Sequence, residues 1–269
     1  MAPPRVLSIA GSDSGGGAGI QADLKAFARC GVHGMTAITA ITAQNTVAVT
    51  AVHPVAPEAI VEQVRAVAED IGVDAVKIGM LGTAETIEAV DRALEHVAGA
   101  PVVLDPVMVA ESGAVLLDES ARAVLRERLV ARATVVTPNV AEARVLAEAG
   151  EDASPEELVR AVHALGPRAV VVTGGHREEV TDLFFDGANL VEIPGERHPD
   201  GAAHGSGCTH SSALAAHLAL GLELVEAAKR AKQVAAEAVR DGLGDIGAGA
   251  GPVDVLGVLR RRDGQSPLT

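Results

Sequence analysis

The segment His204–His210 places two glycines and a thiol directly before an alanine-rich stretch that is typical of a helix. Gly205 and Gly207 allow backbone N–H groups to converge at the helix start, where they and the amide of Ser206 could cradle a phosphoryl group. Cys208 is expected at the helix N-terminus, where the helix dipole lowers the pKa of a thiol. A thiolate there could act as a general base towards a substrate hydroxyl. The residues alone fit equally well a small, half-buried cysteine after a glycine turn.

A second glycine-rich segment, Gly11–Gly19, reads GSDSGGGAG and follows an apolar run. Its five glycines let the backbone approach a ligand closely and expose amides at the start of a helix. It is not a Walker loop, because no Lys-Ser or Lys-Thr pair follows the glycines. The segment therefore predicts a ligand loop, and a flexible tight turn is the alternative.

Two carboxylates follow short apolar runs. Asp105 comes directly after Val102–Leu104, and a carboxylate at a strand end suits magnesium bound through water. An aspartate before a proline is also common in turns. Asn139 and Glu142 have the spacing of a capping box, and on these residues alone a helix cap is the simpler interpretation.

Short apolar runs alternate with amphipathic stretches along most of the chain. This alternation predicts an α/β fold with a mostly parallel sheet and helices on both faces. Ligands bind such sheets at the carboxyl ends of the strands, where the segments described above are expected. The expected strands are Arg5–Ala10, Met35–Ala43, Val47–Val52, Ala75–Ile78, Val102–Leu104, Thr134–Val136, Ala169–Val172 and an antiparallel edge hairpin of Leu183–Phe185 and Leu190–Ile193. The expected helices are Ile20–Cys30, Pro57–Asp70, Thr83–Val97, Asp118–Leu129, Ala141–Glu148, Pro155–Leu165, Gly207–Leu220 and Glu223–Asp241.

The composition limits the classes of function. The 269 residues fit one domain spanning 1–269. With three Phe, no Trp or Tyr and a net charge of −14, the chain is poorly suited to stack on bases or to bind a nucleic-acid backbone. Neither a signal peptide nor an apolar run of about 18 residues is present, so we expect no membrane segment. Cys30 and Cys208 form no disulfide framework, which favours a cytoplasmic location.

Six motifs occur in an order that resembles a known family. They are AGSDSGGGAGIQADLK (Ala10–Lys25), TAQNT (Thr42–Thr46), KIGML (Lys77–Leu81), DPVM (Asp105–Met108), TPNxxE (Thr137–Glu142) and HGSGCT (His204–Thr209). Together they resemble the hydroxymethylpyrimidine/phosphomethylpyrimidine kinases, a branch of the ribokinase superfamily, over about residues 5–255. The resemblance implies a ribokinase-like three-layer sandwich, a homodimer, and the use of ATP and Mg²⁺. It also implies phosphorylation of hydroxymethylpyrimidine, and then of its monophosphate, in thiamine biosynthesis.

The resemblance also implies roles for particular residues. Gln44 is expected to bind the aminopyrimidine edge, since an amide both donates and accepts hydrogen bonds. Cys208 occupies the position of the base, where many ribokinase relatives have Asp. The amides of Gly205, Ser206, Gly207 and Cys208 form an anion hole. The other implied site residues are Gly11, Ala18, Met80 and Val107 for the pyrimidine, and Glu142 and Asp105 for the metal.

The chain departs from the family pattern near the nucleotide. Glu111 and Thr173 stand where the family often has lysine, and His210 stands where it usually has an apolar residue. The turn Glu196–Ala203 also fits poorly. His176, Arg177 or His210 could compensate, although a solvated surface position is the simpler interpretation of each. A pyridoxal or pyridoxine kinase and a non-catalytic pyrimidine-binding protein therefore stay as alternatives.

Overall fold

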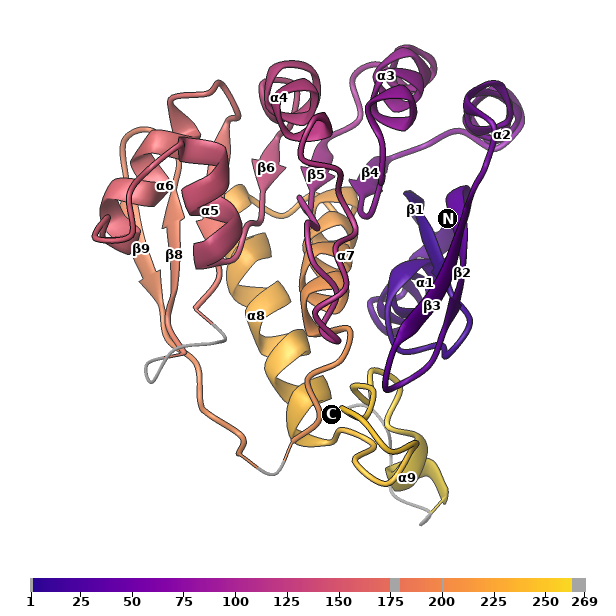
Figure 1. Cartoon of the computed structure of the whole chain (residues 1–269), viewed down its shortest axis with the longest axis vertical. Coiled ribbons are helices and arrows are strands. Elements are labelled where there is room, and N and C mark those ends of the chain that lie inside the picture. Colours follow the sequence, from indigo (N-terminus) through magenta and orange to yellow (C-terminus); the bar gives the residue numbers. More distant parts are fainter. Residues whose placement is uncertain (1, 175–179, 200, 263–269) are drawn as a thin grey trace.

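A nine-stranded sheet forms the centre of the protein in this computed structural model, which describes residues 2–174, 180–199 and 201–262 (Figure 1). The strand order is β3-β2-β1-β4-β5-β6-β7-β8-β9. The strands are β1 (Arg5–Asp13), β2 (His33–Gln44), β3 (Val49–Pro54), β4 (Ala75–Ile78), β5 (Val102–Leu104), β6 (Val135–Val136), β7 (Ala169–Val172), β8 (Asp182–Phe185) and β9 (Leu190–Ile193). All nine expected strands are thus present, with small differences at their ends.

The interior of the sheet is parallel and its two edges are antiparallel. The strands from β2 through β1, β4, β5 and β6 to β7 pair in parallel. At the edges, β3 pairs antiparallel with β2, and β8 and β9 form the expected hairpin beside β7. This arrangement brings the carboxyl ends of β1, β4, β5, β6 and β7 to one side of the sheet.

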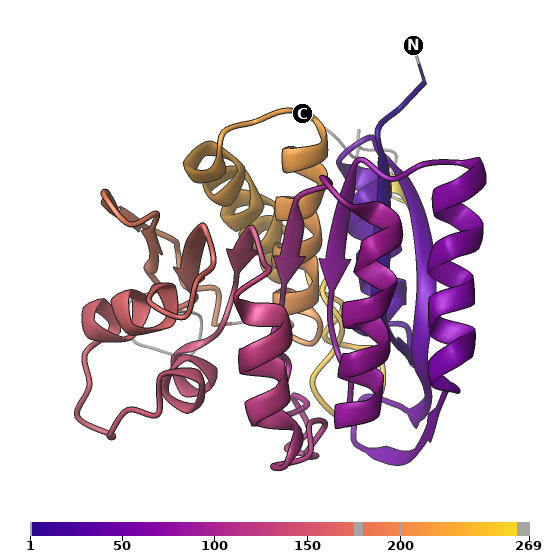
Figure 2. The same cartoon turned by 90° about the horizontal axis from the view of Figure 1, so that it is seen from above.

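Helices cover both faces of the sheet, so the predicted three-layer sandwich is confirmed (Figures 1 and 2). One face packs against α2 (Pro57–Asp70), α3 (Ala84–Ala93), α4 (Ala121–Leu125), α5 (Val140–Ala147) and α6 (Pro155–His163). The other packs against α1 (Gly19–Arg29), α7 (Ser206–Ala219) and α8 (Leu224–Arg240). Short helical segments η1 (Leu94–Val97) and η2 (Arg126–Val130) extend α3 and α4, and α9 (Val258–Arg262), absent from the expected elements, lies near the end of the described chain.

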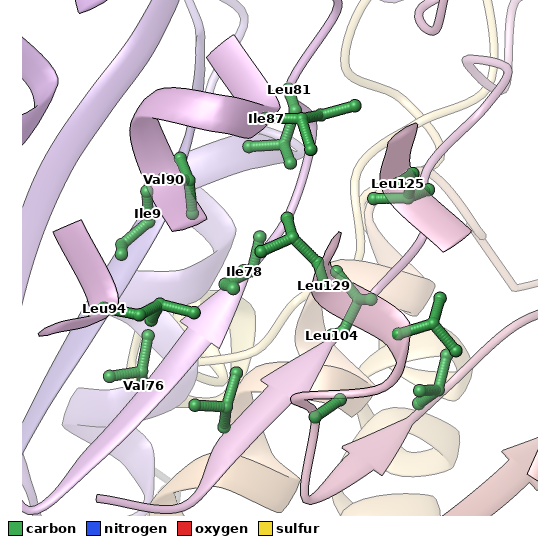
Figure 3. Packing of buried hydrophobic residues seen from close by; sticks show 14 of the residues in the cluster. Ile9, Val76, Ile78, Leu81, Ile87, Val90, Leu94, Leu104, Leu125 and Leu129 are labelled. Carbon is green, nitrogen blue, oxygen red and sulfur yellow. The ribbon is translucent and has the colours of Figure 1, made fainter. Parts of the chain in front are cut away.

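Alternating strand residues build two apolar layers. Leu7 and Ile9 of β1 belong to the cluster beneath α2–α6, whereas Val6 belongs to the cluster beneath α1, α7 and α8. This division follows from the two-residue side-chain period of a strand. Figure 3 shows the first cluster, in which strand residues such as Ile78 and Leu104 point towards helix residues such as Leu129. In the second cluster, small residues such as Ala213, Ala215 and Ala216 allow α7 to pack closely on the sheet.

Local sequence signals fix several helix starts near the site. Asn139 caps α5 and Ser154 caps α6, each with a glutamate three residues later completing a capping box. Gly205 precedes α7 with φ of +87°, a left-handed conformation that favours glycine. Among the described residues, no helix is both long and apolar enough to cross a membrane.

Candidate active site

A cavity of about 450 Å³ opens at the carboxyl ends of the parallel strands. Every residue that the sequence assigned to the site lines this cavity. They are Gly11, Ala18, Gln44, Met80, Asp105, Val107, Glu142, Gly205, Ser206, Gly207 and Cys208. The cavity also contains residues that sequence reasoning missed, above all Asp13, Lys77 and His204.

The glycine-rich loop within Gly11–Gly19, here called the first glycine loop because it comes first along the chain, is organised around Asp13, the last residue of β1. The Asp13 carboxylate accepts hydrogen bonds from the amides of Gly15 at 2.8 Å, Gly17 at 3.0 Å and Ala18 at 2.8 Å. Burial opposes ionisation of Asp13, but the hydrogen bond with His204 and those from the amides outweigh it and lower the pKa of Asp13. The expectation that this loop offers its amides to a ligand is therefore wrong for these three, because an internal carboxylate occupies them.

The first glycine loop lies directly against the loop before α7. His204 Nε2 lies 3.0 Å from Asp13 Oδ2. A Cβ added to Gly17 would lie 2.2 Å from the His204 ring, and one added to Gly205 would lie 1.8 Å from the carbonyl oxygen of Gly17. Both glycines are required for this close approach. The sequence indicated that His204 belongs to the site, since it opens the HGSGCT motif. It could not indicate the contact with Asp13, which is 191 residues away in the sequence.

Gln44 and Met80 lie on the β1–β2 side of the cavity. Gln44 ends β2, and its backbone N–H and C=O both bond with the Ser14 hydroxyl, at 2.8 and 2.7 Å. Its side-chain Oε1 accepts from Thr42 Oγ1 at 3.2 Å. A Cβ on Gly11 would lie 2.5 Å from Met80 Cε, so glycine at this position makes room for the methionine. This side of the cavity combines an amide with an apolar surface, which suits a polar heteroaromatic ring.

The N-terminus of α7 faces the cavity with Gly207 and Cys208 in its first turn. The first amides of a helix have no intrahelical acceptor and favour a bound anion. The Ser206 amide is an exception here, because it donates to the Ala203 carbonyl at 3.0 Å. Ser206 therefore does not contribute a free N–H to the predicted nest of amides in this structure.

The predicted low pKa of Cys208 is wrong. Burial disfavours the thiolate and raises the pKa of Cys208 to about 12, although the Lys77 ammonium and the Gly19 amide act in the opposite direction. The position at the helix N-terminus was predicted correctly. The degree of burial decides the direction of the shift, and the sequence does not reveal it.

Asp105 and Glu142 form the acidic part of the cavity. Asp105 Oδ2 accepts from Ser211 Oγ at 2.9 Å, and burial raises the pKa of this carboxyl. Glu142 completes the capping box of α5 by accepting from the Asn139 amide at 2.9 Å, so it is a helix cap and a cavity residue at once. Burial, and then the charge of Asp105, raise the pKa of Glu142 to about 8. A nearby cation would favour ionisation of both groups.

The opposite side of the cavity is formed by the β7–β8 end of the sheet and α8. Thr173 and Glu111, the positions without the expected lysines, both line the cavity. Lys232 of α8 also lines it, with Nζ 2.7 Å from Asp182 Oδ1. His210 is buried, which contradicts the interpretation as a solvated residue, and burial lowers its pKa. His176 and Arg177 lie outside the described residues.

Comparisons with known proteins identify the family of this chain. A sequence profile described as phosphomethylpyrimidine kinase matches residues 13–254. A hydroxymethylpyrimidine/phosphomethylpyrimidine kinase of Rhizobium meliloti is 52% identical over 254 residues, covering 92% of this chain and 95% of the relative.

Two solved structures extend the comparison. A Bacillus subtilis pyridoxal kinase in complex with ADP has a TM-score of 0.87 at 37% identity, covering 96% of this chain and 99% of its own. A phosphomethylpyrimidine kinase of Clostridium difficile has a TM-score of 0.77 at 39% identity, covering 88% and 99%. The profile and the near full-length identity show that this chain belongs to the phosphomethylpyrimidine kinase family.

Proposed function

We propose that this kinase transfers the γ-phosphoryl group of ATP to the hydroxymethyl group of 4-amino-5-hydroxymethyl-2-methylpyrimidine, and then phosphorylates the resulting monophosphate in thiamine biosynthesis. The observation that carries the proposal is the meeting of Gln44, Asp105 and Cys208 in one cavity at the start of α7. The names of the Rhizobium and Clostridium relatives support the same substrate.

The pyrimidine is proposed to bind on the β1–β2 side. The Gln44 amide pairs with the aminopyrimidine edge, because it can accept from the amino group and donate to a ring nitrogen. Met80 and Val107 contact the ring, and Gly11 and Ala18 allow the backbone to approach it closely. This orientation points the hydroxymethyl group towards Cys208.

Phosphoryl transfer is proposed to occur at the N-terminus of α7. Cys208, as a thiolate, accepts the hydroxyl proton while the substrate oxygen bonds to the γ-phosphorus. The bond from that phosphorus to the bridging oxygen breaks, and ADP leaves with the electron pair. Amides of the Gly205–Cys208 turn stabilise the charge on the moving group.

Magnesium is proposed to bind near Asp105 and Glu142. Their carboxylate oxygens are the ligand type that magnesium prefers, and these two residues would hold the ion directly or through its bound waters. The described residues contain no group of three or more histidine, cysteine or acidic side chains that could hold a metal ion without such additional ligands. When bound, the ion neutralises phosphate charge. Glu142 and Asp105 hold and orient its hydration shell.

ATP is proposed to occupy the β7–β8 side, opposite the pyrimidine across the start of α7. A transfer enzyme must hold donor and acceptor on opposite sides of the moving group, and Gln44 marks the acceptor side. The ADP complex of the Bacillus pyridoxal kinase supports the use of an adenine nucleotide. Lys232 supplies a cation on this side of the cavity.

We also infer a single-domain cytoplasmic enzyme that forms a homodimer. β3 is the terminal strand of the sheet and, among the described strands, pairs with β2 alone, so its outer edge supports the proposal of pairing with a second copy. Sedimentation velocity of the purified protein tests the dimer, and a monomer at micromolar concentration contradicts it.

Turnover with ATP and each candidate alcohol tests the proposed reaction. We expect formation of the pyrimidine monophosphate and then the diphosphate, with a higher kcat/KM than for pyridoxal or pyridoxine. A higher kcat/KM with pyridoxal would instead support the pyridoxal kinase alternative, which the TM-score of 0.87 to the Bacillus enzyme favours. Binding of the pyrimidine without turnover would indicate the non-catalytic alternative.

A further inference from the structure

Lys77 of β4 is completely buried beneath the catalytic cavity, although lysine is almost never found in the interior without a partner. Its Nζ donates to both carboxylate oxygens of Asp23 in α1, at 2.9 and 3.1 Å. The Asp23 side chain is also completely buried. The pair joins two elements that are 54 residues apart in the sequence.

Two serines connect this pair to the strand and helix that build the site. Ser8 Oγ of β1 donates to Asp23 Oδ2 at 2.6 Å, and Ser212 Oγ of α7 donates to Asp23 Oδ1 at 2.7 Å. Ser212 lies one helical turn after Cys208 and therefore on the same side of α7. The charged pair is thus hydrogen-bonded to the helix that carries the proposed base.

The surrounding backbone is shaped to accept the lysine. A Cβ on Gly79 would lie 2.7 Å from Lys77 Nζ and 3.0 Å from the Ala10 methyl group. Glycine at this position therefore makes room for the ammonium group. Burial of an ion pair costs desolvation energy that the attraction between the charges often fails to recover, so stability alone is a weak reason to keep one.

We propose that Lys77 is a positioning residue whose ammonium charge stabilises the thiolate of Cys208 during phosphoryl transfer. Asp23 fixes the ammonium group, and the hydrogen bonds from Ser8 and Ser212 fix Asp23. The inference rests on the proposed function, in which Cys208 accepts the substrate hydroxyl proton. Lys77 does not itself exchange a proton in this step: its charge favours the thiolate before transfer, and the proton ends on sulfur as ADP leaves.

The charges around Cys208 agree with this role. Lys77, which lines the same cavity, is the leading charge that lowers the Cys208 pKa against the effect of burial. Asp23 on α1 and Asp105 after β5 both act in the opposite direction. Lys77 and Asp23 therefore have opposite effects on the pKa of the same thiol.

Because Lys77 and Asp23 shift the pKa of Cys208 in opposite directions, removing each charge separately tests the proposal. In a Cys30→Ala background, Cys208 alkylation by iodoacetamide at pH 8 is followed by mass spectrometry on the free protein. Lys77→Met keeps the length of the side chain and removes its charge, whereas Asp23→Asn keeps hydrogen-bonding capacity and leaves Lys77 unopposed. A charge partner shifts a pKa by about 1–3 units, so the alkylation rate should fall at least about tenfold in the first variant. It should rise several-fold in the second.

Lys232→Met is the matched control, because it removes a second buried lysine–aspartate pair, of which both residues line this cavity. Neither Lys232 nor Asp182 is among the groups that shift the Cys208 thiol, so the alkylation rate should stay within about twofold of the parent. Loosening of the fold would instead speed alkylation in every destabilised variant. Urea unfolding measures that loss separately.

If Lys77→Met does not fold, the double variant Lys77→Met/Asp23→Asn removes both charges and should alkylate more slowly than the parent, since Lys77 lines the cavity together with Cys208 and Asp23 does not. Equal rates in the folded variants, or changes of the same sign in Lys77→Met and Asp23→Asn, overturn the inference. Kinase kcat should fall with the alkylation rate while both KM values stay within about threefold. Loss of the predicted reaction in the parent with retained opposite alkylation effects would count against the proposed function and not against the charge relationship.

Discussion

The His204 imidazole lies 3.0 Å from the Asp13 carboxylate and joins the two glycine loops of the site. The His204 backbone also bonds to the late glycine-rich segment, accepting from the Val253 amide at 3.1 Å and donating to the Gly251 carbonyl at 3.3 Å. One residue therefore joins the two glycine loops that line the cavity to the late Gly251–Val253 segment. This contact fixes the distance between the proposed pyrimidine side and the start of α7.

Loss of this contact should destabilise the protein and slow catalysis together. His204→Ala removes a hydrogen bond to a charged group, which costs about 1.5–3 kcal/mol of unfolding free energy, and should lower kcat more than it changes KM. Urea denaturation and steady-state kinetics measure the two effects. In a double-mutant cycle with Asp13→Asn, a coupling energy below about 0.5 kcal/mol would show that the two side chains act independently.

Residue periodicity was sufficient to predict the sheet and its helices. Ligand sites of such sheets lie at the carboxyl ends of the strands, which correctly predicted that Asp105, Glu142 and Cys208 line one cavity. The predicted ends were less accurate: β1 continues through a bulge to Asp13, beyond the expected end at Ala10. The pairing of Ser12 and Asp13 with β2 extends the strand into the glycine segment.

Contacts between distant residues could not be predicted. Lys77 with Asp23 and Ser212 with Asp23 are separated by 54 and 189 residues, and no local pattern indicates such partners. The raised pKa of Cys208 likewise depends on how much protein covers the thiol, which only the fold determines. The family resemblance supplied the roles of single residues, whereas their electrostatic surroundings required the structure.

Gln44→Ala should weaken use of the pyrimidine far more than use of ATP. A hydrogen bond to a neutral partner contributes about 0.5–1.5 kcal/mol, so the KM for the pyrimidine should rise about two- to twelvefold. The KM for ATP should stay near that of the parent. Gln63→Ala is the control, because this amide bonds to the Ile38 backbone and is not among the cavity residues. An unchanged pyrimidine KM in Gln44→Ala would leave Gln44 as a residue that only anchors its loop.

Glu142→Gln and Asp105→Asn should each raise the magnesium concentration needed for half-maximal activity, because each removes a charge that holds the ion or its water. Titration of activity with magnesium at saturating ATP measures this. Glu157→Gln provides a matched control, since Glu157 completes the equivalent capping box of α6 but does not line the cavity. If all three variants keep the parent magnesium requirement, Glu142 is a helix cap alone.

Without metal, protein stability should fall as the pH rises from about 5 to about 8. Glu142 has an ordinary pKa of 4.5 and a pKa of about 8 in the folded protein, so in this range the folded state binds more protons than the unfolded state. Each further unit of pH then lowers the unfolding free energy by up to about 1.4 kcal/mol from this group. Urea unfolding in EDTA measures the trend. A Glu142→Gln variant with the same slope would assign the pH dependence to another group.

The rate of phosphoryl transfer in Cys208→Ser tests the proposed mechanism most directly. Serine fits the same space, but its hydroxyl has a pKa too high to accept a proton near neutrality, and general-base catalysis contributes about a hundred- to ten-thousand-fold. We predict a kcat lower by that factor, dissociation constants for pyrimidine and ATP within about threefold of the parent, and partial recovery in Cys208→Asp because a carboxylate is ionised at pH 7. A Cys208→Ser enzyme with near-parent kcat would contradict a role for the thiolate in the reaction.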